Sequence, residues 1–263
     1  MLPSCSAGPS NAIRIGSKDS SENATIAEVY AAALEKQHIV VARHLRLGNS
    51  QSVMAALVRG EIDLYPEFVR VEGDEHASAS HEQSRDVTWL SPAPANDSPC
   101  LATSQYAAEQ HWLLSVSKCA RLARKLRLAA TPDFLENGSA LNRLQRLYGG
   151  LEFGKVIECE PGEQYAALGR GDAEVANGFT TDPELVEDQL VILMDDKKFW
   201  PRYHVTPVMR TAVLQSNPHV RSILDRTSRA LTNFAVQQMN VRLSLLHMDP
   251  RDIAEDFIAA NGA

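Results

Sequence analysis

The chain has few cysteines, and their spacing is unlike that of the common zinc sites. Only four occur in 263 residues: Cys5, Cys100, Cys119 and Cys159. They form no Cys-x-x-Cys pair, and no histidines stand beside them at the short spacing of a zinc site. We therefore predict neither a metal ion nor a cofactor. Four cysteines allow three disulfide pairings, and the sequence does not decide whether any forms.

Long apolar runs are also missing. No stretch approaches the ~20 apolar residues that span a bilayer. The first eleven residues, MLPSCSAGPSN, lack the apolar core of a signal peptide. Residues 2–5 (LPSC) are a weak match to the end of a lipoprotein leader, so a leader absent from this chain and a lipid anchor both stay open.

Basic residues are outnumbered by acidic ones. The chain has 26 Lys and Arg against 33 Asp and Glu, which gives a formal net charge of −7 at pH 7. Proteins that bind nucleic acids or anionic membranes need a basic surface to contact phosphates. We therefore predict no nucleic-acid partner.

Known catalytic motifs are missing too. The sequence contains no Gly-x-Ser-x-Gly elbow, no His-Glu-x-x-His, no P-loop and no dinucleotide-binding glycine pattern. Glu67 and Asp182 could serve as an acid and a base. Acids beside aromatic residues more often hold backbone groups or stabilise a bound cation. We predict that the protein is not an enzyme and has no catalytic residue.

The most informative feature is an internal repeat. Residues 56–68 (ALVRGEIDLYPEF) return as residues 167–179 (ALGRGDAEVANGF), with the same offset at both ends (167 − 56 = 111 and 179 − 68 = 111). Gly60 and Gly171 stand where a helix end favours a residue with positive φ. Each copy therefore predicts a helix, a glycine, a short strand and a terminal phenylalanine.

A second similarity supports two related lobes. Residues 126–131 match residues 13–18 in place and character (126 − 13 = 113). Solenoid repeats have periods of roughly 20 to 50 residues, so a period this long favours two similar lobes. Ligands of open α/β sheets bind at the carboxyl ends of the strands, where Phe68 and Phe179 are expected. The alternative is a chance match between alanine-rich helices that precede two core phenylalanines.

The pattern of elements predicts how the lobes are connected. Strands alternate with helices, which favours largely parallel sheets. Residues 91–97 and 199–204 contain the prolines expected where the chain crosses between lobes. Residues 69–85 are predicted to form a loop and a surface helix, and residues 207–263 to return to the first lobe as helices. The predicted domains are residues 1–97 with 204–263, and the inserted residues 98–203.

These segments resemble a known family, the substrate-binding proteins of bacterial ABC importers for glycine betaine, choline and other osmoprotectants. The resemblance runs from residue 13 to 260 and rests on IGSK at 15–18, the first repeat copy, TWLSPAPAND at 88–97, GFTTD at 178–182, DDKKFWPRY at 195–203 and DPRDIAEDFI at 249–258. It implies a type II periplasmic-binding-protein fold. Each α/β lobe would hold a mainly parallel sheet flanked by helices, and a two-strand hinge would join the lobes.

The resemblance also implies a function. Such proteins are periplasmic or extracytoplasmic, capture a solute between their lobes and deliver it to an ABC permease with its ATPase. The expected solute is a quaternary amine of the betaine or choline type, and the protein is expected to be a monomer. A quaternary ammonium donates no hydrogen bond and is held over aromatic faces, each contact contributing roughly 0.5 to 2 kcal/mol.

Carried over by position, the aromatic cage falls on Phe68, Phe179 and Tyr203. Lys18 falls where the family places a cation near the carboxylate of the solute. The full predicted ligand-binding set is Lys18, Phe68, Arg70, Asp97, Asn137, Phe179 and Tyr203.

The sequence departs from the family pattern at three places. Pro99 stands where many members have Tyr, Asn137 where members have Arg, and residues 69–71 (VRV) replace Thr-Gly-Thr. Loss of the arginine removes a bidentate clamp for a carboxylate. Three solutions stay open: Arg70 or Arg202 supplies the cation, the solute lacks a carboxylate as choline does, or the solute is another small polar molecule such as an amino acid. A sensory module with the same fold is a further alternative.

Overall fold

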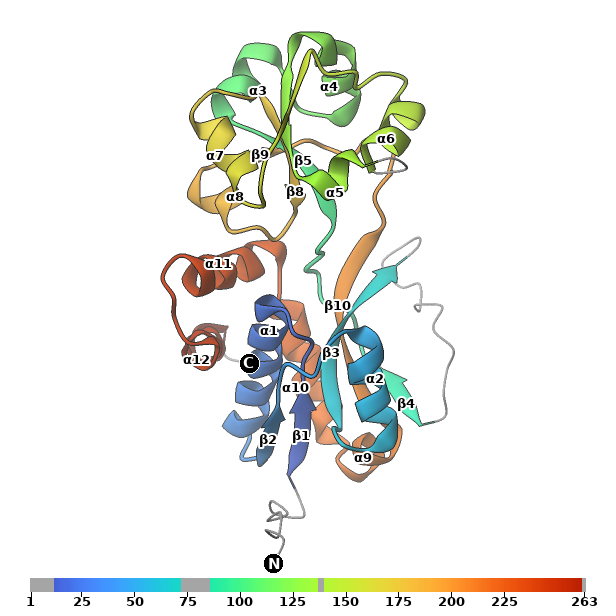
Figure 1. Cartoon of the computed structure of the whole chain (residues 1–263). Coiled ribbons are helices and arrows are strands. Elements are labelled where there is room, and N and C mark those ends of the chain that lie inside the picture. Colours follow the sequence, from blue (N-terminus) through green and yellow to red (C-terminus); the bar gives the residue numbers. More distant parts are fainter. Residues whose placement is uncertain (1–11, 72–85, 137–139, 262–263) are drawn as a thin grey trace, which may run out of the picture. The chain divides into compact units, whose positions relative to one another are not determined.

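In the computed structural model, which describes residues 12–71, 86–136 and 140–261, the chain forms two compact units. Unit 1 comprises residues 1–96 and 203–263, and unit 2 comprises residues 97–202. Each unit is built around its own five-stranded sheet flanked by helices (Figure 1). Unit 2 is therefore an insertion into the chain of unit 1, and the chain passes between the units at residues 96–97 and 202–203.

The sheet of unit 1 is mixed. Its strand order is β2-β1-β3-β10-β4. β1 pairs in parallel with β2 and β3, whereas β4 pairs antiparallel with β10. The strands are β1 (Ile13–Gly16), β2 (Val41–His44), β3 (Leu64–Val71), β4 (Val87–Trp89) and β10 (Arg202–Arg210). The helices are α1 (Ser21–Lys36), α2 (Ser50–Arg59), α9 (Thr211–Ser216), α10 (His219–Ala230), α11 (Asn233–Ser244) and α12 (Pro250–Asn261).

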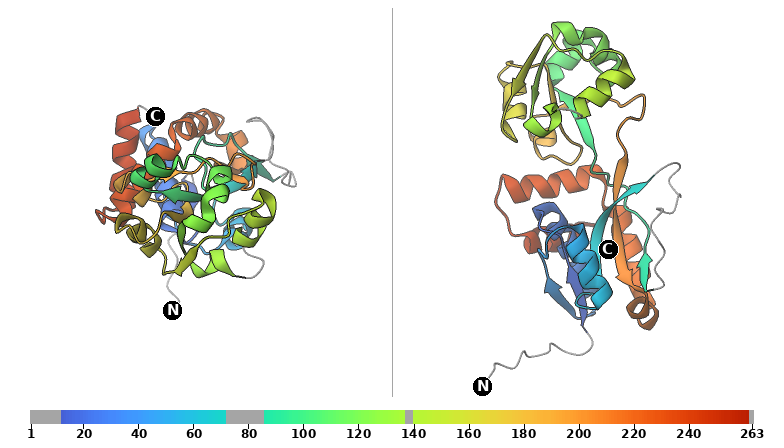
Figure 2. Two further views of the ribbon diagram at one scale, coloured as in Figure 1. Left: turned by 90° about the horizontal axis from the view of Figure 1, so that it is seen from above. Right: turned by 45° about the vertical axis from the view of Figure 1, so that its right-hand side comes forward.

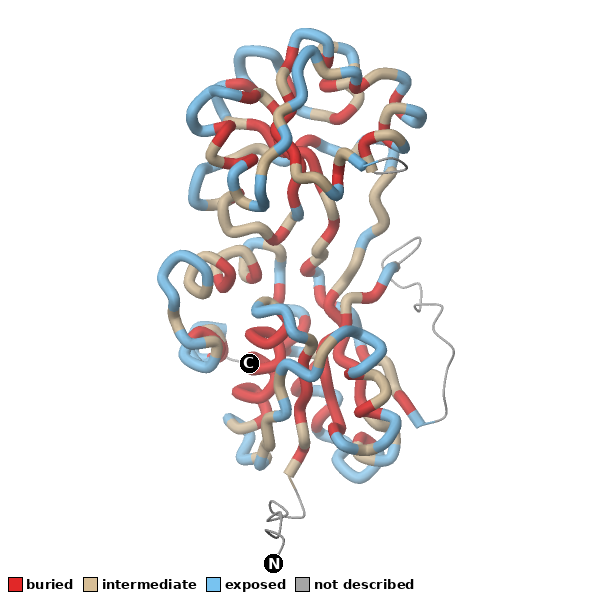
Figure 3. The backbone as a smooth tube through the Cα atoms, in the orientation of Figure 1, coloured by how far each residue is buried: buried red, intermediate tan, exposed pale blue. Residues whose placement is uncertain are grey.

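Both faces of this sheet are covered by helices (Figure 2). Successive residues of a strand point to opposite faces. Leu64 and Met209 accordingly join the core cluster that contains α1, while their neighbours Tyr65 and Val208 join the cluster that contains α2. Buried residues run along almost the whole of α1 (Figure 3), because α10, α11 and α12 also pack on it.

Unit 2 has a sheet of the same design, with the order β7-β6-β8-β5-β9. β6 pairs in parallel with β7 and β8, and β5 pairs antiparallel with β8 and β9. The strands are β5 (Pro99–Thr103), β6 (Arg127–Ala130), β7 (Lys155–Glu158), β8 (Val175–Phe179) and β9 (Val191–Ile192). The helices are α3 (Gln105–His111), α4 (Val116–Leu122), a 3-10 turn (Ala123–Lys125), α5 (Pro132–Leu135), α6 (Ala140–Tyr148), α7 (Glu163–Gly169) and α8 (Glu184–Glu187).

The internal repeat seen in the sequence occupies equivalent places in the two units. The register that pairs Ile15 of β1 with Leu64 of β3 returns as the pairing of Leu128 with Val175 in unit 2. These pairs are related by the offsets of the sequence repeat (15 + 113 = 128 and 64 + 111 = 175). Both repeat glycines follow a helix with positive φ as predicted, 73° for Gly60 and 72° for Gly171. The repeat strands are β3, which begins at residue 64, and β8, which begins at residue 175.

Each repeat glycine is also held by an arginine from the neighbouring strand. In unit 1, Arg14 donates through Nη1 to the Gly60 carbonyl at 2.5 Å and through Nε and Nη2 to the Asp63 carboxylate. In unit 2, Arg127 donates through Nη2 to the Gly171 carbonyl, at 2.7 Å, and through Nε and Nη2 to the Glu174 carboxylate. One guanidinium thus fixes the turn between helix and strand in each unit.

We expect alanine at either repeat glycine to lower the free energy of unfolding by about 1 kcal/mol, because a Cβ disfavours positive φ. A Cβ at Gly60 would meet the Arg210 guanidinium at 3.2 Å, and one at Gly171 would meet nothing within 4 Å. Gly169→Ala is the control, since Gly169 is helical and its Cβ would also meet nothing within 4 Å. It should be neutral or stabilise slightly. Urea unfolding of the three variants checks this, and equal losses in all three would contradict it.

Three expectations need correction. Each sheet is mixed, because β5 and β10 run antiparallel to neighbouring strands. Residues 69–71 belong to β3 rather than to a loop, while the surface helix predicted within residues 72–85 lies outside the described residues. Pro207 lies inside β10 rather than at the start of the C-terminal helices. Proline is unusual in an inner strand, but residues 205–209 are all buried and the Pro207 carbonyl accepts the Leu90 N–H at 3.0 Å.

Candidate functional site

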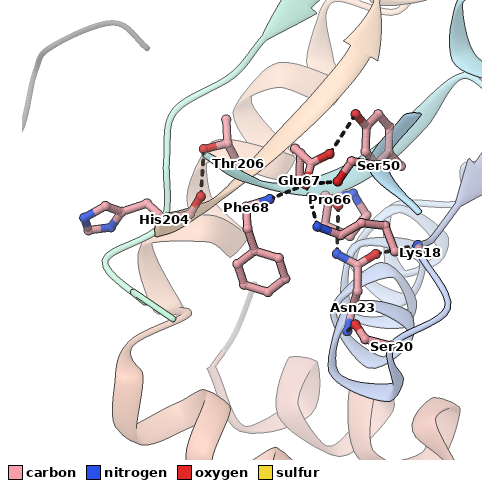
Figure 4. A network of polar contacts seen from close by, with 10 residues as sticks. Lys18, Ser20, Asn23, Ser50, Pro66, Glu67, Phe68, His204 and Thr206 are labelled. Carbon is pink, nitrogen blue, oxygen red and sulfur yellow. Dashed lines mark hydrogen bonds and ion pairs between the residues drawn. The ribbon is translucent and has the colours of Figure 1, made fainter. Parts of the chain in front are cut away.

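The polar network of unit 1 is centred on the buried carboxylate of Glu67, on β3 (Figure 4). Lys18 Nζ donates to Glu67 Oε1 at 2.6 Å, and the Phe68 N–H donates to the same oxygen at 2.8 Å. The hydroxyls of Ser50 and Tyr65 complete the set, each at 3.3 Å. The charge of Glu67 is therefore balanced by Lys18. We call Lys18, Glu67 and Phe68 the unit 1 cluster.

The backbone of Lys18 is anchored by a buried asparagine. The Lys18 N–H donates to Asn23 Oδ1 at 2.8 Å, and Asn23 Nδ2 donates to the Pro66 carbonyl at 2.9 Å. Ser20 starts α1 by accepting the Asn23 N–H, so Asn23 stands in the first turn of this helix. The side chain of Asn23 thus joins the end of β1 to β3, and it fixes the point from which Lys18 extends.

Phe68 presents its ring to a cation. Its side chain is partly buried and packs against the core of unit 1. Lys18 Nζ lies 4.7 Å from the ring centroid, within the range of a cation–π contact, and Figure 4 shows the two side chains next to each other below β3. The side chain of Lys18 is 17% exposed. Its ammonium carries three N–H groups, so it retains donors beyond the bond to Glu67.

The corresponding place in unit 2 holds an exposed phenylalanine. Phe179 is the last residue of β8, and 47% of its surface is exposed. Its N–H donates to Asp182 Oδ2 at 2.8 Å, and the Tyr165 hydroxyl donates to the same oxygen. Burial raises the pKa of Asp182, although these two hydrogen bonds act to lower it. We call Tyr165, Phe179 and Asp182 the unit 2 cluster.

Gly178 leaves the space that this cluster needs. A Cβ at Gly178 would lie 2.7 Å from Tyr165 Cζ and closer still to the hydroxyl oxygen. It would also lie 3.0 Å from Asp182 Oδ2. Any larger residue at this position would therefore displace the Tyr165 ring or break its bond to Asp182.

Each cluster contains a carboxylate that holds the repeat phenylalanine, but this carboxylate comes from a different position in each unit. Gly178 stands at the repeat position of Glu67 (67 + 111 = 178), so unit 2 has no acid within the strand. Asp182 supplies the carboxylate from beyond the strand instead. In both units a carboxylate accepts the main-chain N–H of the repeat phenylalanine, Phe68 or Phe179, together with a tyrosine hydroxyl.

The clusters differ in charge. Thr131 of unit 2 stands at the repeat position of Lys18 (18 + 113 = 131). Its N–H donates to Asn177 Oδ1 at 3.0 Å, much as the Lys18 N–H donates to Asn23. Unit 2 therefore keeps the anchored turn but has no cation on it.

Other predicted residues lie as follows. The Asp97 carboxylate accepts the Thr181 hydroxyl at 3.0 Å, within unit 2. Pro99 begins β5 and lies directly opposite Phe179 in the strand register. Since cross-strand neighbours share one face of a sheet, a tyrosine at Pro99 would be the natural cover for the Phe179 ring. With proline at this position, Phe179 is 47% exposed.

The remaining predicted residues lie on β3 and β10 or outside the described part of the chain. Tyr203, the second residue of β10, is half-buried, and its N–H donates to Asn96 Oδ1 at 2.9 Å. Arg70 is an exposed residue of β3, and Arg202 is the exposed first residue of β10. Asn137 lies outside the described residues.

Sequence reasoning missed the residues that hold these side chains in place. Asn23, Ser50, Tyr65 and Tyr165 were not among the predicted site residues, yet each bonds to a member of a cluster. One signal was available, because the repeat aligns Glu67 with Gly178. A glycine at the repeat position of an acid indicates that another group fills the space of the missing side chain. The structure shows that this group is Tyr165.

Comparison with known proteins places this chain in a family. Residues 11–260 match the family model described as the substrate binding domain of the ABC-type glycine betaine transport system. The glycine betaine-binding protein YehZ of Escherichia coli (strain K12) is 26% identical over 287 residues, covering 99% of this chain and 93% of the relative. The ergothioneine transport permease/ergothioneine binding protein EgtU of Helicobacter pylori (strain G27) is also 26% identical, over 273 residues, covering 97% of this chain. The chain spans about half (49%) of the length of that relative.

A solved structure shows the same fold. The crystal structure of a glycine betaine/carnitine/choline ABC transporter protein superposes with a TM-score of 0.87 at 20% identity, covering 95% of this chain and 98% of the other. In the part of the chain that the structure describes, no helix is long and apolar enough to cross a membrane. The family match covers nearly the whole chain, so the protein belongs to the family of substrate-binding domains of ABC-type glycine betaine transport systems.

Proposed function

We propose that this protein captures a small solute with a quaternary ammonium group, of the betaine or choline type, and delivers it to an ABC permease. One observation carries the proposal: the repeat phenylalanines Phe68 and Phe179 both have their main-chain N–H held by a carboxylate. A quaternary ammonium makes no hydrogen bond, and it is stabilised by aromatic faces and by nearby negative charge. The unit 2 cluster offers this combination, while in the unit 1 cluster Lys18 balances the charge of Glu67. The family is one of substrate-binding proteins and not a class of enzymes.

We propose a division of roles among the residues. Phe68, Phe179 and Tyr203 contact the ammonium group. Lys18 donates its remaining N–H groups to an acceptor on the solute, such as a carboxylate or hydroxyl oxygen. The full proposed ligand-binding set is the one expected from sequence: Lys18, Phe68, Arg70, Asp97, Asn137, Phe179 and Tyr203.

The proposal extends to the setting in which the protein works. Units 1 and 2 act as the two lobes. The domain bounds expected from sequence, residues 1–97 with 204–263 and residues 98–203, lie one residue from the bounds of these units. The protein acts outside the cytoplasm as a monomer, with or without a lipid anchor, and its partners are a permease and an ATPase. The fusion of permease and binding protein named in the Helicobacter pylori relative supports the permease partner.

A thermal-shift screen tests the proposed solute class. The panel contains glycine betaine, proline betaine, choline, carnitine, ergothioneine, ectoine and amino acids. A solute at a hundred times its dissociation constant should add about 2.7 kcal/mol of stability. We expect a quaternary amine to raise the melting temperature, and Phe179→Ala and Tyr203→Ala to remove most of that rise.

Matched variants separate binding from general effects of truncation. Phe234 and Tyr106 are 64% and 74% exposed and lie outside both clusters. Phe234→Ala and Tyr106→Ala should therefore keep the full shift. A flat response to every amine, together with a shift for a sugar or an inorganic anion, would reject the proposed solute class.

A further inference from the structure

The unit 2 cluster has a carboxylate that forms no ion pair with any residue that the structure describes. Glu67 of unit 1 is paired with Lys18 at 2.6 Å, but the repeat position of Lys18 in unit 2 is Thr131. Among the ion pairs formed by the described residues, none includes Asp182. The same structural element therefore carries no net charge in unit 1 and a negative charge in unit 2.

The two hydrogen bonds to this carboxylate leave part of it available. The Tyr165 hydroxyl and the Phe179 N–H both reach Oδ2, so Oδ1 is not used by either donor. Asp182 is only partly buried. The exposed ring of Phe179 belongs to the very residue whose N–H the carboxylate accepts. A group that rests on this ring is thus held by a residue whose main chain contacts the Asp182 carboxylate.

The titratable groups around Asp182 are all acidic. Tyr165 on α7, Cys100 on β5 and Glu184 on α8 interact with it electrostatically, and Asp97 acts on Cys100 as well. Burial raises the pKa of Tyr165, Cys100 and Glu184, as it does for Asp182. No neighbouring group in this set supplies a positive charge. The region beside Phe179 is therefore suited to an external cation.

We propose that Asp182 is the residue by which unit 2 distinguishes a permanently cationic solute group from an uncharged group of the same shape. This inference rests on the proposed function, because it concerns how the ammonium end is recognised. The face of Phe179 accepts methyl groups whether or not they surround a charge. Only the cation gains from the Asp182 carboxylate, and it does so without a hydrogen bond, because Coulombic attraction acts across several ångströms.

Calorimetric titration with two matched pairs of solutes tests this role. Choline is compared with 3,3-dimethylbutan-1-ol, and glycine betaine with 3,3-dimethylbutanoate, in which carbon replaces the charged nitrogen. Asp182→Asn keeps an oxygen that can accept from Tyr165 and Phe179 but removes the charge. We expect it to weaken binding of the cation of each pair about tenfold and to leave the carbon isostere unchanged. Asp188→Asn makes the same charge change at an exposed position and should have little effect.

A pH series on the unaltered protein gives a second measurement that needs no variant. Because the pKa of Asp182 is raised, its charge is lost at a higher pH than that of an ordinary aspartate. The preference for choline over its isostere should therefore fall as the pH is lowered through that value. In Asp182→Asn this fall should be smaller, with Glu184 as the remaining nearby acid.

The outcomes separate the inference from the proposed function. If the unaltered protein binds neither choline nor glycine betaine, the proposed solute class fails, and the inference fails with it. If it binds them but Asp182→Asn weakens cation and isostere equally, Asp182 only maintains structure, and the inference alone is overturned. A preference for the cation that does not change with pH or in Asp182→Asn would overturn it as well.

Discussion

Replacing Asp63 with alanine is expected to lower the free energy of unfolding by about 3 kcal/mol, because it leaves two arginines without their shared partner. The Asp63 carboxylate is buried and accepts the Arg14 N–H, its Nε and its Nη2 at 2.7 to 3.0 Å, and Arg210 Nη1 at 3.2 Å. Both arginine side chains are about a third exposed (35% and 33%), so they can turn partly toward water. For this reason the expected loss of unfolding free energy is at the lower end of the range for a broken buried ion pair.

The pH dependence of unfolding gives an independent check on Asp63. Burial alone would raise the pKa of Asp63, but its hydrogen bonds with Arg14 and Arg210 hold that pKa below the ordinary value of 3.8. A carboxyl with a lowered pKa in the folded protein stabilises the fold fully above its unfolded pKa. That stabilisation is lost as the pH falls from about 3.8 through the folded pKa. Asp63→Ala should lack this component of acid unfolding.

Two further variants calibrate the result for Asp63. Glu174, its counterpart in unit 2, has a more exposed side chain (18% against 3%), and its partner Arg127 is 40% exposed. Glu174→Ala should therefore be less destabilising than Asp63→Ala. Glu61 pairs with Arg59 on the surface, where both side chains are 58% exposed, and Glu61→Ala should change little. Equal effects of the three substitutions in urea unfolding would contradict this ranking.

Gly178→Ala is expected to destabilise unit 2 by about 3 kcal/mol and to abolish detectable binding of the solute that scores in the thermal-shift screen. The new Cβ would lie 2.7 Å from Cζ of the buried Tyr165. If the Tyr165 ring moved away, its hydroxyl would lose the hydrogen bond to Asp182. Asp182 would then no longer hold the Phe179 N–H in its present geometry. Urea unfolding and calorimetric titration measure the two effects.

A double-mutant cycle shows whether a clash with Tyr165 causes the loss of stability in Gly178→Ala. Tyr165→Phe removes the hydroxyl oxygen nearest to the new Cβ, so Gly178→Ala should cost less in that background than in the unaltered protein. Tyr165→Phe by itself removes only one of the two hydrogen bonds to Asp182, so some solute binding should remain. If the losses of unfolding free energy in the two single variants simply add up in the double variant, the clash with Tyr165 is not the reason for the destabilisation.

Patterns within short stretches of the sequence were sufficient to predict much of the fold. Gly60 and Gly171 were predicted from their place after a helix, and both have positive φ. The strand-and-helix alternation and the repeat predicted two similar α/β units. Pro207 was not predicted to lie in a strand, because proline prefers strand edges, but it lies within β10, where residues 205–209 are all buried.

The sequence by itself determined the repeat, the family and the two phenylalanines that the repeat aligns, because these depend on the order of residues along the chain. In the structure Phe179 ends β8 as expected, whereas Phe68 lies within β3. Only the tertiary structure decided how the charges are paired. Lys18 reaches Glu67 across 49 residues of sequence. Asp182, whose hydrogen bonds come from Tyr165 and Phe179, has no such cation among the described residues. The physical reason is that an ion pair depends on distance in space and on burial, and neither follows from spacing along the chain.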